Sequence, residues 1–415
     1  MNKILGIFLA TFLMIVGMNG SVDAAANLKI GVILVGDETE GYTEAHIKGI
    51  TEAARDLGIN GNQIIWKKKV AEDSTCYETA NDLAKQGCNL IISNSYGHQT
   101  FIAKAAEKNP NQTFVAVTGD FAKVSGLKNF KNAFTNVYES RYVSGVVAGM
   151  KLEELLNSGA LNKTSQPESF TSAGKVKVGY IGAFNYAEVV SGYTAFYLGI
   201  KSIVPDVVME VVYTNSWFDP DKEAVAARDL VSSGAVIIGQ HADSAGSPSA
   251  IQELLKSGKI CYAVGYNVDM RDAAPDAILT SATNNWKVYY KYLFAAMMNG
   301  KKIKTDWAEG YSQGAVGITA LGKSCAVGTA EKVAEIESQI SSGKLKIFDT
   351  NSFTVNGQRL NSAEVDLSFM DWSKNPPSVI YKGKKINAIK DGYFAESFYR
   401  SAPYFSLRID GIIER

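Results

Sequence analysis

The sequence is poor in residues that bind metals or cross-link secreted proteins, with four cysteines and three histidines among 415 residues. It contains no CxxC or HExxH motif, so we predict no dedicated metal site. Cys76 and Cys88 flank a predicted helix, and a helix of that length holds its ends about 18 Å apart, beyond the reach of a disulfide. A bridge would therefore need a pairing with Cys261 or Cys325, and free thiols also remain open.

The sequence also lacks a net charge, because its 42 lysine and arginine residues equal its 42 aspartate and glutamate residues. Without an excess of one sign there is no electrostatic basis for binding nucleic acid or an anionic membrane. Enzyme motifs are missing as well: there is no GxSxG elbow, no GxGxxG after the first predicted strand and no GxxxxGK[ST] loop. Ser244, His241 and Asp243 are too close in the chain to form a catalytic triad. We therefore predict neither catalysis nor a cofactor.

Long apolar runs are limited to residues 4–18, which follow Lys3 and precede small residues at 21–26. This order is typical of a secretory signal peptide, here residues 1–26. The run is shorter than the about 20 residues that span a bilayer, and no cysteine near the cleavage point could carry a lipid. We expect a periplasmic or extracellular protein that is soluble after cleavage of this peptide.

Strands and helices alternate through the rest of the chain, which predicts an α/β fold with right-handed βαβ units and parallel sheets. A polar loop at 157–174 interrupts the pattern, and the pattern then restarts, so we expect two Rossmann-like lobes. The predicted strands are 29–35, 63–67, 89–93, 113–117, 176–181, 209–213, 235–238, 260–264 and 277–281. A helix at about 285–298 should return the chain to the first lobe.

Polar and aromatic residues gather after the predicted strands, at the edge where open αβ sheets bind their ligands. This mixture suits a planar heterocycle, since aromatic rings stack on its faces and amides or carboxylates bind its edges. The candidate ligand-binding residues are Tyr42, Ser95, Tyr96, Trp217, Asp243, Asp269 and Trp286.

Each candidate has a structural alternative. Tyr42, Tyr96, Trp217 and Trp286 could be packing residues, because large aromatic side chains dominate protein cores. Asp269 could instead form a turn. Asp219 before Pro220 predicts a helix N-cap in preference to a ligand contact, and His241 fits an interior histidine better than a catalytic base.

Several segments, taken in order, resemble the basic membrane protein family, and the resemblance runs from about residue 29 to about residue 353. They are Gly41-Tyr42, residues 93–97, 138–145, 216–220, 240–244 and 265–270, Thr280-Ser281 and Asn285-Trp286. Members of this family are substrate-binding proteins of ABC transporters with the type I periplasmic binding protein fold. The resemblance implies two lobes with a hinge between them, a purine base or nucleoside as ligand, a membrane permease as partner, and a monomer.

The resemblance also implies roles for single residues. Trp217 would stack on the base from the second lobe, Tyr42 would form the opposing face, and Asp269 would bind ribose hydroxyls. Asp243 and Ser244 replace the glycine-rich turn of nucleoside binders, and the family lysine after the Thr-Ser pair is absent. These departures favour a free base.

The expected lobes comprise residues 27–140 with about 278–325, and residues 141–277 with about 326–371, followed by a C-terminal extension at 372–415. Two other functions remain open: a secreted nucleoside-metabolising enzyme on the same scaffold, and a ligand-sensing domain.

Overall fold

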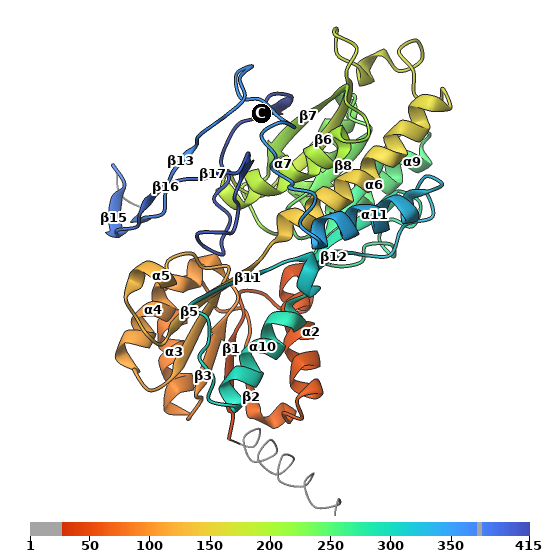
Figure 1. The fold of residues 1–415 in the computed structure, drawn as a ribbon. Helices are drawn as coiled ribbons and strands as arrows, with labels where there is room; N and C mark the ends of the chain where they lie inside the picture. Colours follow the sequence, from red (N-terminus) through yellow and green to blue (C-terminus); the bar gives the residue numbers. More distant parts are fainter. Residues whose placement is uncertain (1–26, 372–375) are drawn as a thin grey trace, which may run out of the picture.

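The structure is a computed structural model that describes residues 27–371 and 376–415. The predicted signal peptide lies outside the described residues. Within the described ranges, no helix has the length and apolar character needed to cross a membrane. The described chain forms two αβ lobes, shown one above the other in Figure 1, which confirms the expected fold class.

The first lobe is built on a six-stranded sheet in which all neighbouring strands are parallel. In spatial order its strands are β11 (Asp306–Glu309), β5 (Phe130–Thr135), β4 (Thr113–Val117), β3 (Leu90–Ser93), β1 (Ile30–Ile33) and β2 (Ile64–Lys67).

The second lobe has a seven-stranded sheet, in which only the pairing of β12 with β10 is antiparallel. In spatial order its strands are β12 (Val316–Ile318), β10 (Ile278–Asn284), β9 (Tyr262–Tyr266), β8 (Ile237–Gln240), β6 (Val176–Gly182), β7 (Val207–Tyr213) and β19 (Ile412–Glu414).

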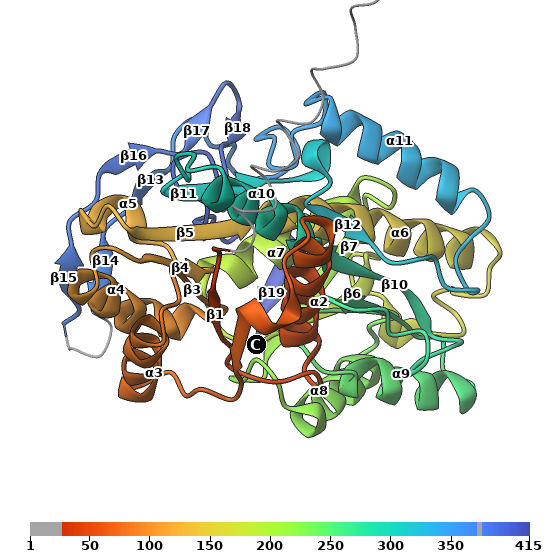
Figure 2. The same cartoon turned by 90° about the horizontal axis from the view of Figure 1, so that it is seen from below.

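Helices cover both faces of each sheet, as Figures 1 and 2 show. They are α2 (Gly41–Asp56), α3 (Ser74–Lys85), α4 (Gln99–Lys108), α5 (Ala122–Ser125), α6 (Val137–Asn157), α7 (Ala187–Lys201), α8 (Pro220–Ser232), α9 (Gly246–Lys256), α10 (Trp286–Met298) and α11 (Thr329–Ser341). Alternate strand residues therefore enter different cores. Ile30 and Val32 pack with α2 and α10, whereas Ile33 packs with α3 and α4.

Three segments connect the lobes and are hydrogen-bonded to one another. The N–H of Asn136 donates to Glu309 O over 2.9 Å, and the N–H of Asn285 donates to Ala315 O over 2.8 Å. The hydroxyl of Thr135 donates to Asn284 Oδ1. These residues form the hinge. The return of the chain to the first lobe through α10 is confirmed, because α10 packs on α2.

The lobe boundaries differ from those expected. Strands β10 and β12 belong to the second sheet, although the expected boundary near 278 placed them in the first lobe. The reason is that β10 continues the parallel pairing beyond β9, so the chain crosses only after β10 ends.

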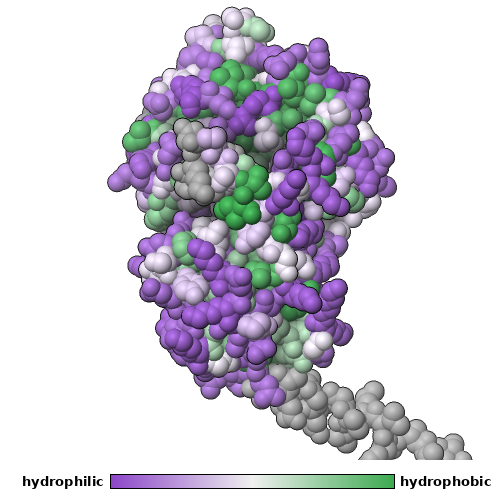
Figure 3. Space-filling model, turned by 90° about the vertical axis from the view of Figure 1, so that its left-hand side faces the viewer, coloured by the Kyte–Doolittle hydropathy of each residue, from purple (hydrophilic) through white to green (hydrophobic). Residues whose placement is uncertain are grey.

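The segment that follows the two lobes is not a separate appendage. It forms three short antiparallel pairs: β13 (Glu364–Asp366) with β16 (Lys385–Asn387), β14 (Phe369–Asp371) with β15 (Ser378–Tyr381), and β17 (Ile389–Lys390) with β18 (Tyr393–Phe394). Strand β19 then joins the second sheet beside β7. Figure 3 views the side of the molecule that carries these pairs, where apolar residues lie among polar ones.

Candidate ligand-binding cleft

The carboxyl ends of the two sheets face each other across a cleft between the lobes. The ring of Tyr96, after β3, lies 6.5 Å from the ring of Tyr186, after β6. On another side of the cleft, Gly41 at the start of α2 meets the second lobe so closely that an added Cβ would lie 3.3 Å from Asp243 O. The groove beside this contact encloses about 680 Å³, and both Asp243 and Asp269 line it.

The wall from the first lobe is formed by α2. Tyr42 is half-buried, donates its hydroxyl hydrogen bond to Asn94 O, and presents its ring edge-on to His46, 4.5 Å away. Behind them the His46 ring stacks on Trp286 at 4.4 Å, and His46 Nδ1 lies 2.6 Å from the hydroxyl of Tyr290. Burial lowers the pKa of His46 to about 3, so this imidazole is neutral.

The wall from the second lobe is aromatic. Phe184 and Tyr186 follow β6 and stack on each other with ring centroids 5.3 Å apart. Trp217, after β7, lies 5.3 Å from Phe184 and 6.2 Å from Tyr186. Tyr186 is 51% exposed, so part of this aromatic surface is open to a ligand. Three rings from two strand ends thus form one apolar face.

Beneath this aromatic face lies a group of buried polar side chains. His241 Nε2 is 3.1 Å from Glu188 Oε1, while Nδ1 has no hydrogen-bond partner among the described residues. The guanidinium of Arg141 lies 3.6 Å from the centroid of the Tyr266 ring and donates to Gln240 O. Burial, with the positive charge of Arg141, lowers the pKa of His241 to about 4. This region can therefore supply hydrogen bonds to a ligand's edge.

Asp243 connects the cleft to the hinge. Its Oδ1 accepts a 2.6 Å hydrogen bond from Asn267, whose own Oδ1 accepts one of 3.1 Å from Asn284. Asn284 in turn accepts from Thr135 in the hinge. Burial, followed by the charge of Glu40, raises the pKa of Asp243 well above its usual value, so the surroundings of this carboxyl favour its protonated form.

Five of the seven predicted residues lie at or near the cleft, and Ser95 and Trp286 are buried. Tyr96 meets Tyr186 across the lobes, Trp217 packs beside Tyr186, and Tyr42 lies on the α2 wall. Asp243 lines the groove and Asp269 lies at its rim, where Arg271 donates to both carboxylate oxygens over 2.6 to 3.0 Å. Ser95 is buried and donates to Glu72. Trp286 is 1% exposed, so it supports His46 from behind instead of forming the surface of the cleft.

Sequence reasoning did not select His46, Arg141, Tyr186 or Glu188 as ligand contacts, and it set His241 aside. Some of these residues carried usable signals. His46 follows Tyr42 by one helical turn and so shares its face, and Arg141 is a lone charge in a stretch of α6 whose other residues are buried. Among the described residues, no group of three or more histidine, cysteine, aspartate or glutamate side chains could hold a metal ion. All four cysteines are free thiols.

Two αβ lobes with a polar and aromatic cleft between their strand ends define a two-lobed solute-binding protein. Residues 28–351 match the family described as ABC transporter substrate-binding protein PnrA-like, and the chain belongs to this family. The resemblance to basic membrane proteins is thereby confirmed.

Two individual relatives and one solved structure are similar to this chain. The chain is 32% identical over 334 residues to a purine-binding protein of Brucella abortus, covering 80% of this chain and 86% of that protein. It is 22% identical to basic membrane protein A2 of Borrelia garinii, covering 69% of this chain and 77% of that protein. An ABC transporter solute-binding protein from Conexibacter woesei superposes with a TM-score of 0.58 at 18% identity, covering 77% of this chain and 98% of that chain, which shows the shared fold.

Proposed function

We propose that this chain is the extracytoplasmic receptor of an ABC importer and binds a purine base or a purine nucleoside between its lobes. The observation that carries the proposal is the aromatic face of Phe184, Tyr186 and Trp217. The buried residue Asp243 lies next to it, because its N–H donates to Trp217 O over 2.8 Å. The purine-binding relative in Brucella abortus supports this ligand class.

The chemistry of the cleft suits a flat heterocycle with polar edges. An aromatic face stacks on a base, and a ring from the opposite lobe can close over it. Asp243 can accept hydrogen bonds and, in the protonated form that its burial favours, can also donate one, which suits a purine edge. Arg141 and His241 have further nitrogen atoms without partners in the described chain. Binding of this kind needs no catalytic group.

The remaining parts of the proposal follow from the family. The receptor would act outside the cytoplasm after removal of residues 1–26, would work as a monomer, and would deliver its ligand to a membrane permease. The enzyme and sensor alternatives gain no supporting feature from the cleft.

The first prediction concerns stacking. Trp217→Ala and Tyr42→Ala should each weaken binding of adenine, because one aromatic face contributes about 1–3 kcal/mol, or roughly tenfold to a hundredfold in Kd. Isothermal titration calorimetry with adenine, guanine, hypoxanthine and their nucleosides measures the effect.

The matched control is Trp66→Ala, since Trp66 is half-buried on β2 and packs against the first-lobe core. Its affinity should equal that of the wild type. Binding of ribose or glucose in the same titrations, with no purine bound, would contradict the proposal.

The second prediction separates base from nucleoside. Because Arg271 already engages Asp269 at the rim, we expect a free base, and Asp269→Ala should change adenine and adenosine affinity alike. A ribose held by this carboxylate would contribute about 1.5–3 kcal/mol per charged hydrogen bond. A selective loss of adenosine of tenfold or more would therefore show a nucleoside site. Asp206→Ala, which removes an exposed carboxylate before β7, is the control for charge.

A further inference from the structure

Residues 395–405, here called the C-terminal arm, lie beyond the 28–351 match to the family and contact both lobes. The arm follows β18 and precedes the segment that leads to β19. It is therefore a connection between the lobes in addition to the three hinge segments.

The arm is anchored in the core of the second lobe. Phe405 is fully buried and stacks on Phe348 with ring centroids 4.3 Å apart. The N–H groups of Tyr404 and Phe405 donate to the carboxyl of Glu396 over 3.1 and 3.2 Å. Apolar packing and hydrogen bonds thus both fix this turn to the second lobe.

Between these anchors the arm reaches the first lobe. Arg400 Nη1 lies 3.4 Å from Asp120 Oδ2, and the two side chains are only 14% and 12% exposed. The N–H of Ser401 donates to Asp306 Oδ2 over 2.8 Å, and Lys123 donates to Tyr399 O over 2.7 Å. These three polar contacts attach the arm to the first lobe.

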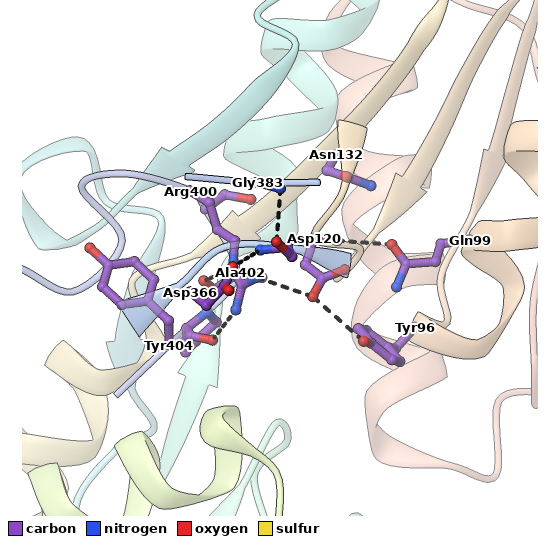
Figure 4. A network of polar contacts seen from close by, with 12 residues as sticks. Tyr96, Gln99, Asp120, Asn132, Asp366, Gly383, Arg400, Ala402 and Tyr404 are labelled. Atoms are coloured by element: carbon purple, nitrogen blue, oxygen red, sulfur yellow. Dashed lines mark hydrogen bonds and ion pairs between the residues drawn. The ribbon is translucent and has the colours of Figure 1, made fainter. Parts of the chain in front are cut away.

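The first-lobe end of this contact lies at the ligand edge of the sheet. Asp120 follows β4, its N–H bonds to Gln99, and its Oδ2 lies 3.5 Å from the hydroxyl of Tyr96 (Figure 4). Tyr96 is the residue whose ring faces Tyr186 of the second lobe. Arg400 is thus linked through one carboxylate to a ring that borders the cleft.

We propose that Arg400 is a positioning residue, through which the C-terminal arm holds Tyr96 and Asp120 in place and limits how far the two lobes separate. Opening about the hinge moves the first lobe away from the second, in which the arm is rooted. The Arg400–Asp120 contact has to break, or the arm has to shift, before the lobes part fully.

The test compares Arg400→Met, Asp120→Asn and the double variant with the wild type in the full-length protein. Small-angle X-ray scattering without ligand should show a larger radius of gyration for each variant. Stopped-flow dissociation of adenine should be about tenfold faster. The double variant should be no worse than either single variant, because both remove the same contact.

Lys385→Met is the matched control, since Lys385 of β16 pairs with Glu364 of β13 and both side chains are exposed. Asp120→Asn removes the same contact without changing the sequence of the arm. If Arg400→Met does not fold, the radius of gyration and dissociation rate of Asp120→Asn test the proposal. An unchanged radius of gyration and dissociation rate in both single variants, at the melting temperature of the wild type, would overturn the proposal. The scattering measurement needs no ligand, so it remains decisive if the protein binds no purine.

Discussion

At the scale of single residues, Glu223 shows how the cleft side of the second lobe holds a carboxyl group out of water. Its side chain is fully buried, and Oε1 accepts hydrogen bonds of 3.2 Å from the N–H groups of Ser244 and Asp219. Its Oε2 has no partner within the described residues. Burial raises the pKa of Glu223 to about 7, so the folded protein retains this proton over a range where the unfolded chain loses it.

This shift predicts a pH dependence of stability. The pKa of Glu223 is raised above its usual value of 4.5 to about 7, so its contribution to stability is fully present below about pH 4.5 and is lost as the pH rises to about 7. Glu223→Gln cannot titrate, so relative to the variant the wild type should lose about 3 kcal/mol of unfolding free energy across this window. Urea unfolding at several pH values measures both proteins.

Glu44→Gln, which alters an exposed side chain on α2, should give a pH profile parallel to that of the wild type. Parallel profiles for Glu223→Gln and the wild type would show that folding does not raise the pKa of this carboxyl.

Asp219, by contrast, is the N-cap of a helix, as its sequence context predicted. It precedes Pro220 at the start of α8, and its side chain accepts a 3.0 Å hydrogen bond from the N–H of Lys222. A cap depends on neighbours in sequence, so local chemistry suffices to predict it.

At the scale of elements, α6 and α7 pack through glycines. An added Cβ on Gly145 would lie 2.2 Å from Phe196 O, and one on Gly199 would lie 2.2 Å from Tyr142 O. Both obstacles are backbone atoms, which cannot rotate away. The two helices can approach this closely only because both contact positions lack a side chain.

Gly199→Ala should therefore push α7 away from α6 and destabilise the second lobe by about 1–3 kcal/mol, the usual range for overpacking. Thermal unfolding followed by circular dichroism measures the loss. Gly61→Ala is the control, because a Cβ there meets no atom within 4 Å. Equal melting temperatures for the two variants would contradict the packing argument.

Most sheet strands could be predicted from short apolar runs, but β5 could not. It contains Lys131 and Asn132, which are buried because Lys131 Nζ donates to Lys128 O and Asn132 bonds to Ala116 O and the N–H of Ala122. The partners of Asn132 come from β4 and α5, so hydropathy along the chain gives no sign of them. The pairing of β19 with β7 was also missed, because the two strands lie about 200 residues apart in the chain.

At the scale of the whole molecule, the sequence located the loops of the cleft better than it assigned the residues within them. Trp217 and Asp243 lie at strand ends, and the rule for open αβ sheets finds such positions. Trp286 was chosen by the same reasoning, yet helix α10 points it into the core beneath His46. Which side of a helix faces a cleft depends on the packing of the two lobes, and this information is not local.

The position of β19 has a consequence for the order of folding. Ile412 pairs with Met209, so a loop of about 200 residues has to close before the second sheet gains this edge strand. Until then β7 presents unpaired backbone groups that another chain could extend. The strands of the first sheet, in contrast, are all in place by Glu309. We therefore expect the first lobe to form early during synthesis and the second to wait for residues that emerge much later.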